Sequence, residues 1–392
     1  MKKLENVLKN KIVIFMIFLI FLMPYYFETI EIVKVIFDIL NIVTSIFFIV
    51  MYLIKKKINK IFFPLMGYYF ILLISTIIND SGLIYYSYKV LTIFGFIAFV
   101  DLLFENDSFF KPFVSYITIF NIINFISILI SPNRNININV NRIYFLGYDN
   151  DFNLILTMAC YILLIYHYKL KKEKGPKYNK IRIIFYINYV VAFISAFFVQ
   201  SATFKISMLM FLFCYFFFFA TSFLPRIVFN YKVYLTLAYI IFIGLVFFNV
   251  QNNFGTLLGS LNRDITFTGR TEIWDKTLEE IEDNKIIGTG YMNMKQRMEK
   301  MNIYHAHSTY LNILLESGII GELTYLILLI FIGCRIKKID DKNLVNITSF
   351  AIFTYLIMSI FEVYIDILYF YLLVVVISNL SNNNKTKIIY RR

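Results

Sequence analysis

Cysteine is scarce in this sequence. Its three cysteines, Cys160, Cys214 and Cys334, lie inside or at the end of apolar runs and form no CxxC pair. The pattern therefore supports neither a disulfide framework nor a zinc site. A cleavage pattern of small residues is also missing after the first apolar run, so we expect that run to be retained as a helix. No internal repeat of fixed period is evident, whereas repeat symmetry is typical of secondary transporters.

Charged side chains are also few. Only 16% of the residues are charged and 59% are hydrophobic, with a mean hydropathy of +0.69. A soluble globular domain is roughly half apolar and about a quarter charged, so water is not the main solvent of this chain.

Apolar runs of membrane-spanning length recur from Ile12 almost to the C-terminus. We predict an all-α polytopic membrane protein with about 12 transmembrane helices, folded as a single membrane domain over residues 1–392. The predicted spans are 12–27, 32–54, 61–78, 83–104, 113–130, 152–168, 183–200, 204–224, 228–249, 308–334, 344–360 and 363–379.

The basic residues are concentrated between these spans. The formal net charge of +13 raises the question of a nucleic acid partner, but the clusters at 2–11, 55–60, 169–182 and 335–342 all fall at alternate turns. This is the positive-inside pattern, which explains most of the excess without nucleic acid. It predicts that both termini are cytoplasmic, including a tail over residues 381–392. His167, at the inner end of the sixth span, is expected to contact lipid headgroups.

Two longer segments, 131–151 and 250–306, are then predicted to be extracytoplasmic. In the second, Thr268 can cap a helix over 270–283, in which Ile273, Trp274, Leu278 and Ile281 recur at helical spacing. The pattern predicts a short amphipathic helix on the outer surface. Trp274 is the only tryptophan of the chain, and we expect it to anchor this helix at the membrane interface.

His305 and His307 close the large outer loop. A neutral imidazole there can accept a proton near pH 7. An interfacial polar pair is the plain alternative, and a metal site is disfavoured because no cysteine or third histidine lies outside. Glu362 and Asp366 are expected to share a face at the outer end of the last span, where carboxylates could bind sugar hydroxyls.

Several cations oppose the positive-inside bias. They are Arg134, Arg142, Lys205, Arg263 and Arg270. A phosphorylated substrate would compensate for this placement, because guanidinium groups bind phosphate oxygens through paired hydrogen bonds. Pairing with Asp149, Asp151, Asp264 or Glu272, or simple solvation, is the alternative.

The outer segments resemble the O-antigen polymerase and ligase superfamily of bacterial envelopes. Residues 268–274 (TGRTEIW) and 284–290 (NKIIGTG) look like the loop helix of that family, with its GR, its W and its closing GxG. Residues 305–311 (HAHSTYL) and 316–321 (ESGIIG) look like its signature of a histidine entering a span with an E-x-G-x-x-G turn. A weaker likeness covers 142–153, which holds R-x-x-x-x-G followed by the asparagine-rich residues 150–153.

Two positions depart from the family pattern. Ser308 stands where the family usually has asparagine, and Ser201-Ala202 lacks the arginine of a frequent Ser-Arg pair. Lys205, one helical turn later, is the candidate substitute.

The resemblance implies a membrane glycosyltransferase of the C-type fold whose donor is a glycan on undecaprenyl diphosphate. It implies that His307 and His305 are catalytic, that Arg270, Arg142 and Lys205 bind the diphosphate, and that no metal or other cofactor is needed. Glu272, Trp274, Tyr310 and Glu316 are expected to shape the substrate cavity. Single displacement would invert the anomeric centre.

We predict a polymerase that joins undecaprenyl-diphosphate-linked repeat units at the outer face of the bacterial cytoplasmic membrane. Its expected partners are the lipid-linked donor and acceptor, the bilayer, and flippase and chain-length regulator proteins. A ligase that moves a finished glycan to another acceptor, or a flippase of lipid-linked saccharides, is the alternative.

Overall fold

The protein is described by a computed structural model. It covers residues 10–55, 58–105, 109–130, 143–173, 176–220, 230–254, 267 and 269–382. Within these residues the chain is almost entirely helical, and its two strands, β1 (Ile143–Tyr144) and β2 (Gly147–Tyr148), form one short antiparallel hairpin. Arg134, Arg142, Arg263 and Thr268 lie outside the described residues.

Twelve apolar helices occupy the twelve predicted spans. Eight are long and apolar enough to cross a membrane: α4 (Glu31–Ile54), α6 (Leu83–Glu105), α7 (Phe110–Ile130), α8 (Asp149–Glu173), α9 (Pro176–Phe198), α10 (Ala202–Cys214) continued by the π-helix η1 (Tyr215–Ala220), α15 (Thr309–Ile336) and α16 (Lys342–Phe361). Four are shorter: α2 (Lys11–Phe21), α5 (Phe62–Ile78), α11 (Tyr231–Val246) and α17 (Leu368–Asn382). The prediction of an all-α polytopic membrane protein is confirmed.

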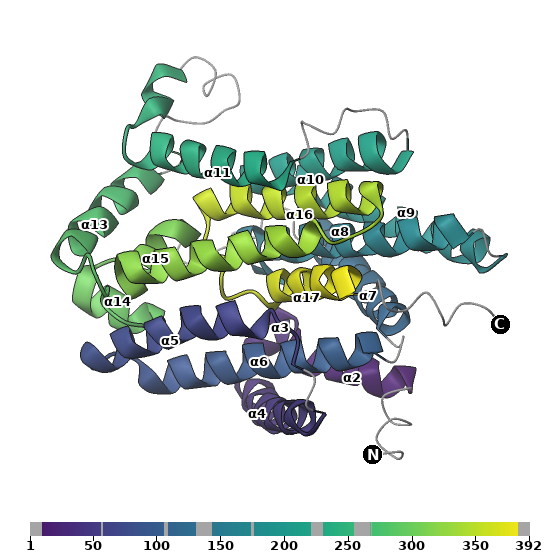
Figure 1. The fold of residues 1–392 in the computed structure, drawn as a ribbon, viewed down its shortest axis with the longest axis horizontal. Coiled ribbons are helices and arrows are strands. Elements are labelled where there is room, and N and C mark those ends of the chain that lie inside the picture. Colours follow the sequence, from purple (N-terminus) through teal and green to yellow (C-terminus); the bar gives the residue numbers. More distant parts are fainter. Residues whose placement is uncertain are drawn as a thin grey trace.

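The remaining elements are short. They are α3 (Tyr25–Glu28), the 3-10 helix η3 (Val250–Phe254), α13 (Arg270–Asp283) and α14 (Met294–Met301). Figure 1 shows α13 and α14 together at the left end of the bundle, beside the start of α15. We call the end formed by residues 269–308 and 362–367 the histidine end.

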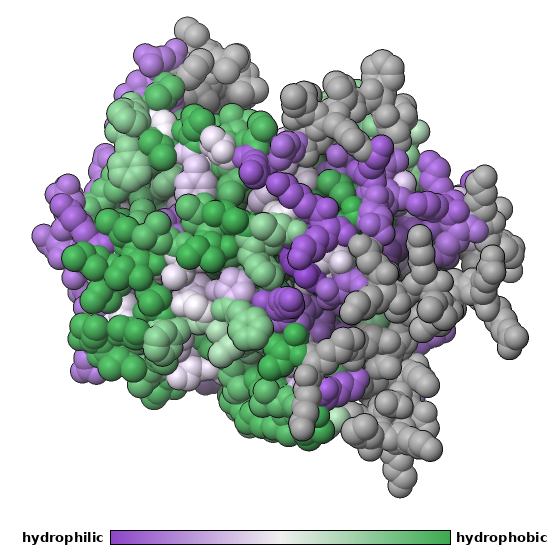
Figure 2. Space-filling model, viewed as in Figure 1, coloured by the Kyte–Doolittle hydropathy of each residue, from purple (hydrophilic) through white to green (hydrophobic). Residues whose placement is uncertain are grey.

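Hydrophobic side chains cover the sides of the bundle. Figure 2 shows a broad hydrophobic area over the helices, with hydrophilic residues at the left margin and across the right half. Many apolar residues on the outer helices are exposed, among them Ile32 (75%) and Ile84 (83%). Such side chains are stable only in contact with lipid, and the helices satisfy their own backbone groups there.

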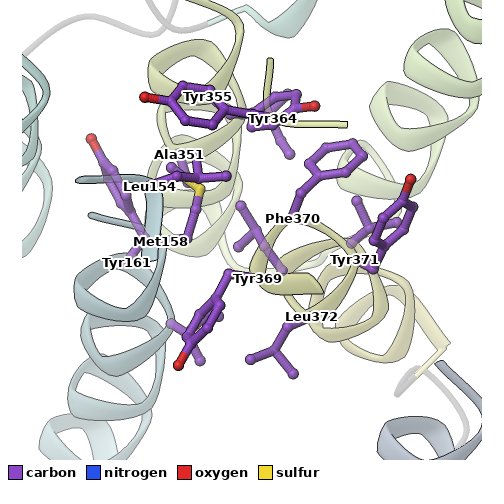
Figure 3. Packing of buried hydrophobic residues seen from close by; sticks show 14 of the residues in the cluster. Leu154, Met158, Tyr161, Ala351, Tyr355, Tyr364, Tyr369, Phe370, Tyr371 and Leu372 are labelled. Carbon is purple, nitrogen blue, oxygen red and sulfur yellow. The ribbon is translucent and has the colours of Figure 1, made fainter. Parts of the chain in front are cut away.

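Helix α17 lies in the interior of the bundle, and most of its side chains are buried. Tyr355 of α16 stacks on Phe370 of α17 with ring centroids 4.0 Å apart, and Leu154 and Met158 of α8 close the same cluster (Figure 3). This packing holds α8, α16 and α17 in a fixed relation, so it also fixes the connection between α16 and α17.

Helix α15 is broken at Gly318, whose φ of 62° and ψ of −165° are not helical. A break inside a membrane helix leaves backbone groups that must find partners within the protein. The segment 285–290 supplies them: Thr289 N donates to Leu315 O (2.8 Å), Gly290 N to Glu316 O (3.0 Å), Ile319 N to Lys285 O (2.9 Å) and Ile320 N to Ile286 O (3.4 Å). The two glycine motifs of the sequence therefore meet, and their first role is architectural.

Glycine is required on both sides of this contact. Gly288 has a φ of 80°, and a Cβ there would lie 2.5 Å from the backbone at Glu316. A Cβ at Gly318 would lie 2.3 Å from the carbonyl oxygen of Ile286. No side chain fits at either position without moving backbone.

Candidate active site

His305 and His307 lie in the turn that enters α15. Ser308 caps the helix by accepting a hydrogen bond from Leu311 N, which is a role that asparagine also performs. The substitution at this position therefore preserves the cap. His307 itself adopts a φ of 45°, a left-handed conformation that is uncommon outside glycine and that tends to occur at functional sites.

Glu362 is the residue around which the histidines gather. It follows the last residue of α16 in an extended conformation (φ −155°, ψ 161°). Thr309 Oγ1 donates to Glu362 O (2.9 Å) and accepts from Tyr364 N (2.9 Å). The first residue of α15 thus fixes the α16–α17 connection beside the histidine turn.

Three side chains contact the Glu362 carboxylate. His307 Nδ1 lies 3.0 Å and His305 Nδ1 lies 3.6 Å from Oε1, while an Arg270 guanidinium nitrogen lies 2.9 Å from Oε2. The exposed fraction of the side chain is 7% for Glu362, 18% for Arg270 and 25% for each histidine. The group is therefore largely shielded from water but still reachable.

The charges of this group are set by burial and by one another. Burial opposes ionisation of Glu362, but the hydrogen bond from His307 and the charge of Arg270 outweigh it and hold the pKa below its ordinary value. Burial and the neighbouring His307 lower the pKa of His305 to about 4. His305 is accordingly neutral at pH 7, and its Nδ1 accepts from the His307 backbone N–H (3.3 Å).

The carboxylate at Nδ1 also determines which nitrogen of His307 is basic. A neutral imidazole donates its single N–H to the carboxylate, so the proton is on Nδ1 and Nε2 keeps its lone pair. Among the described residues none is bonded to Nε2. His307 is thus arranged as a general base with a carboxylate that orients it.

Trp274 packs against the turn that holds the histidines and donates a hydrogen bond to it. The predicted amphipathic helix is α13, with the expected bounds, but the prediction that Trp274 anchors it at the membrane interface is wrong. The side chain is 1% exposed, its Nε1 donates to His307 O (3.4 Å), and its ring packs near Phe267 and Phe361. Amphipathic spacing identifies an apolar face and cannot tell whether lipid or protein covers it.

The asparagine segment before the sixth span reaches the same region. Tyr364 OH donates to Asn150 O (2.9 Å) and accepts from Asn153 Nδ2 (3.1 Å), and Ser201 Oγ donates to Asn150 Oδ1 (2.9 Å). The start of α8, the start of α10 and the α16–α17 connection are therefore joined. Lys205 lies one turn into α10, half-buried, and makes no ion pair with a described residue.

Three of the residues predicted to shape the cavity do not contact the Glu362 carboxylate: Glu272, Tyr310 and Glu316. Glu272 is 75% exposed and pairs with Lys276 one turn along α13. Tyr310 is fully buried, donates to Leu356 O (3.1 Å) and packs against Phe242. Glu272 is two residues beyond Arg270 and Tyr310 is three beyond His307 in sequence, but helical geometry turns both side chains to other faces.

Glu316 belongs to a second charged cluster. It is 2% exposed and bonded to Arg297 of α14, whose other nitrogen donates to Asn312 Oδ1 (2.6 Å). Lys89 of α6 pairs with Asp366 and lies 4.2 Å from the centre of the Tyr291 ring. Glu362 and Asp366 do not share a helical face as predicted, because residues 362–367 are not helical.

The sequence analysis missed Arg297 and Lys89 and gave Glu362 too small a role. Residues 294–301 carried a usable signal, since Asn293 and Gln296 form a capping box at the start of α14. His167 also differs from expectation: it is fully buried, and its ring stacks on Phe185 with centroids 4.6 Å apart.

His305, His307 and Glu362 bring donor atoms within 4.8 Å of one another, a set that could hold a metal ion. Arg270 already occupies the second oxygen of Glu362, and its positive charge opposes a divalent cation at the first. The donor set therefore fits a proton-transfer site better than a metal site, and metal independence stays a prediction.

Comparison with known proteins supports the resemblance. Residues 189–326 match the model of the O-antigen ligase family, a stretch that includes α10, α13, α14, both histidines and the break in α15. This segment resembles the O-antigen ligase family. The predicted membership of the O-antigen polymerase and ligase superfamily is thereby confirmed over this part of the chain, whereas Glu362 lies beyond it.

A curated relative points the same way. The exopolysaccharide production protein ExoQ of Rhizobium meliloti (strain 1021) is 28% identical over 129 residues. The match covers 29% of this chain and 29% of the relative. No solved structure matches the chain.

Proposed function

We propose that the protein is a surface-glycan polymerase that joins repeat units carried on a polyprenyl diphosphate, at the outer face of a bacterial cytoplasmic membrane. The observation that carries the proposal is the Glu362 group, which unites a base and a guanidinium in one shielded, water-accessible site. Multi-pass architecture and the O-antigen ligase segment support it.

In the proposed reaction an acceptor sugar hydroxyl attacks the anomeric carbon of the donor. The C1–O bond to the diphosphate breaks, and the hydroxyl proton passes to His307 Nε2. Glu362 stabilises the imidazolium that forms, as it already accepts the hydrogen bond of Nδ1. Such a single displacement inverts the anomeric centre.

Arg270 is proposed to stabilise the leaving diphosphate. Its guanidinium has five N–H donors, and one of them donates to Glu362 in this structure. The other N–H groups can therefore bind phosphate oxygens. Arg142 and Lys205 remain proposed contributors. His305 is neutral, so it is proposed to position the turn and bind substrate rather than neutralise phosphate.

A ligase is the second candidate, because the matching family is described as O-antigen ligase. The name of the curated relative, an exopolysaccharide production protein, fits polymer synthesis instead. Both reactions use the same donor chemistry and differ in the acceptor. The flippase alternative is less well supported by the Glu362 group, because a flippase does not deprotonate an acceptor hydroxyl or stabilise a leaving diphosphate.

The test uses the full chain in lipid nanodiscs with undecaprenyl-diphosphate oligosaccharide as donor and acceptor. A polymerase extends the substrate into a ladder of longer chains. Transfer only to a different added acceptor would replace the polymerase with a ligase, and movement across vesicles without lengthening would replace both with a flippase.

Arg270→Ala probes the site within the same assay. Loss of one charge-stabilising group should lower the elongation rate about 100-fold or more. The matched control is Arg182→Ala, which removes an exposed arginine from α9. Equal activity of the two variants would refute the proposed role of Arg270.

A further inference from the structure

A pocket of about 390 Å³ lies at the end of the bundle opposite the histidine end. It is enclosed by the start of α11, the end of α15 and the start of α16. Helix α15 begins beside His307 and ends at Ile336, and α16 begins at Lys342 and ends beside Glu362. The pocket is therefore separated from the candidate active site by the full length of both helices.

The mouth of this pocket is positively charged. Lys337 and Lys342 line it, and neither forms an ion pair with a described residue. Asp340 also lines it but is engaged in an interaction of its own. The N-terminus of α11, which is capped by the neutral Asn230, lies here as well, and its partial positive charge adds to the attraction for an anion, whereas the carboxylate of Asp341 already caps the N-terminus of α16.

A buried hydroxyl points to a ligand deeper in the pocket. Ser349 lines it, is 1% exposed, and its Oγ has no hydrogen-bond partner among the described residues. Leaving a buried hydroxyl unpaired is costly, so native proteins rarely do so without reason. Asn346 lies between Lys342 and Ser349 on the same face of α16, one turn from each.

The pocket is deep enough to cross the interfacial zone of a bilayer. Lys342 and Ser349 are seven residues apart on a helix, or about 10 Å at 1.5 Å per residue. The polar zone on each side of a bilayer is about 5–7 Å thick. When Lys342 is at the outer edge of this zone, Ser349 therefore lies just past its inner edge, at the start of the acyl chains and directly below the ester groups.

We propose that this pocket binds the headgroup and ester region of an anionic glycerophospholipid. Lys337 and Lys342 bind the phosphate, the amides of Asn230 and Asn346 contact headgroup oxygens, and Ser349 donates to an ester carbonyl. A zwitterionic lipid would bring an ammonium group close to two lysines, so it fits less well. The site requires nothing from the proposed glycan chemistry.

The test measures thermal unfolding of the full-length protein in detergent during titration with dioleoyl phosphatidylglycerol, dioleoyl phosphatidylcholine or inorganic phosphate. Phosphatidylglycerol should raise the unfolding midpoint and the other two should not. The double variant K337A/K342A should weaken the apparent affinity about 25-fold, since each lysine near an anionic lipid strengthens binding about fivefold. Native mass spectrometry should find less retained phospholipid on Ser349→Ala.

The matched control is K232A/K338A, which removes two exposed lysines that do not line the pocket. Its affinity should stay within about twofold of the parent, as for exposed changes that remove no specific contact. An equal loss of lipid affinity in both double variants would mean that diffuse surface charge causes the binding, and it would overturn the site. Equal shifts with phosphatidylcholine or with inorganic phosphate would also overturn it. If K337A/K342A does not fold, Lys342→Gln carries the same comparison.

Discussion

Glu362 and Asp101 are both buried carboxylates, each 5% exposed, and they lie at opposite ends of the bundle. Asp101 accepts hydrogen bonds from Tyr52 OH, Asn59 Nδ2 and Asn379 Nδ2, all at 2.7 Å. Glu362 is held by Arg270 and His307 instead. The donors of Asp101 are neutral groups from three separate parts of the chain, whereas those of Glu362 are charged or titratable.

This difference distinguishes a carboxylate that joins helices from one that holds the residues of the candidate site. The three donors of Asp101 are amides and a phenol, whose bonding serves to join helices. Arg270 and His307 keep further nitrogen atoms that no described residue uses, so Glu362 orients groups that can still act on a substrate. The backbone also differs between the two sites. His307, which contacts Glu362, has a positive φ, whereas Asp101 lies within a regular helix.

The largest expected effect comes from removing the base. His307→Ala should lower the rate of chain elongation about 1000-fold, because general-base catalysis contributes a factor of this order. Single-turnover elongation on a defined oligosaccharide measures it. The control is His167→Phe, which replaces the buried histidine of the aromatic cluster in α8 with another ring and should leave the rate unchanged. Elongation by His307→Ala at the parental rate would assign the base elsewhere.

Two glycines with nearly equal φ form the next test. Gly288→Ala should lower the free energy of unfolding by about 4 kcal/mol, since left-handed strain and a clash with backbone add together. Gly269 has a φ of 82° with nothing within 4 Å of a new Cβ, so Gly269→Ala should cost only about 1 kcal/mol. Thermal unfolding in detergent compares them, and equal losses would contradict the packing described for residues 285–290.

Replacing each carboxylate by its neutral amide tests the contrast between Glu362 and Asp101 directly. Glu362→Gln should lower elongation about 10- to 100-fold, as loss of an orienting partner does, while unfolding changes little. Asp101→Asn should lower the free energy of unfolding by about 2 kcal/mol and leave the specific activity of the folded protein intact. Loss of stability in Glu362→Gln together with loss of activity in Asp101→Asn would reverse the assignment of the two residues.

The smallest effect concerns pH. The pKa of His305 is about 4 in the folded protein against 6.5 ordinarily, so the unfolded chain binds a proton over this range while the folded protein does not. Stability is full above pH 6.5 and falls as the pH drops towards 4. Between pH 7 and pH 5 the loss should be about 1 kcal/mol, given partial solvent contact. His305→Gln should reduce this loss, and an unchanged pH profile would contradict the assignment.

Much of the fold was readable from the sequence because lipid imposes a simple requirement. Every apolar run long enough to cross a bilayer became a helix, and α13 has the predicted bounds. The last span was misplaced at its start: α17 begins at Leu368 rather than residue 363. Hydropathy could not detect this, since four of the five non-helical residues from Val363 to Ile367 are apolar or aromatic.

The site was only partly predictable. The histidines and Arg270 were identified through local motifs, but Glu362 is 55 residues beyond His307 in sequence, and only tertiary packing brings them together. The same limitation applies to Arg297 and Glu316. Tyr310 and Glu272 were expected to shape the cavity because they lie in the same motifs as His307 and Arg270, but the helix directs nearby side chains to different faces.

The break in α15 has a consequence for how the chain is made. The backbone groups exposed near Gly318 find their partners in residues 285–290, which precede α15 in the chain and therefore leave the ribosome first. When the translocon releases this helix into lipid, the segment that pairs with it has already been synthesised and needs only to fold back. Insertion of an interrupted span and docking of the preceding loop thus become a single step in biogenesis.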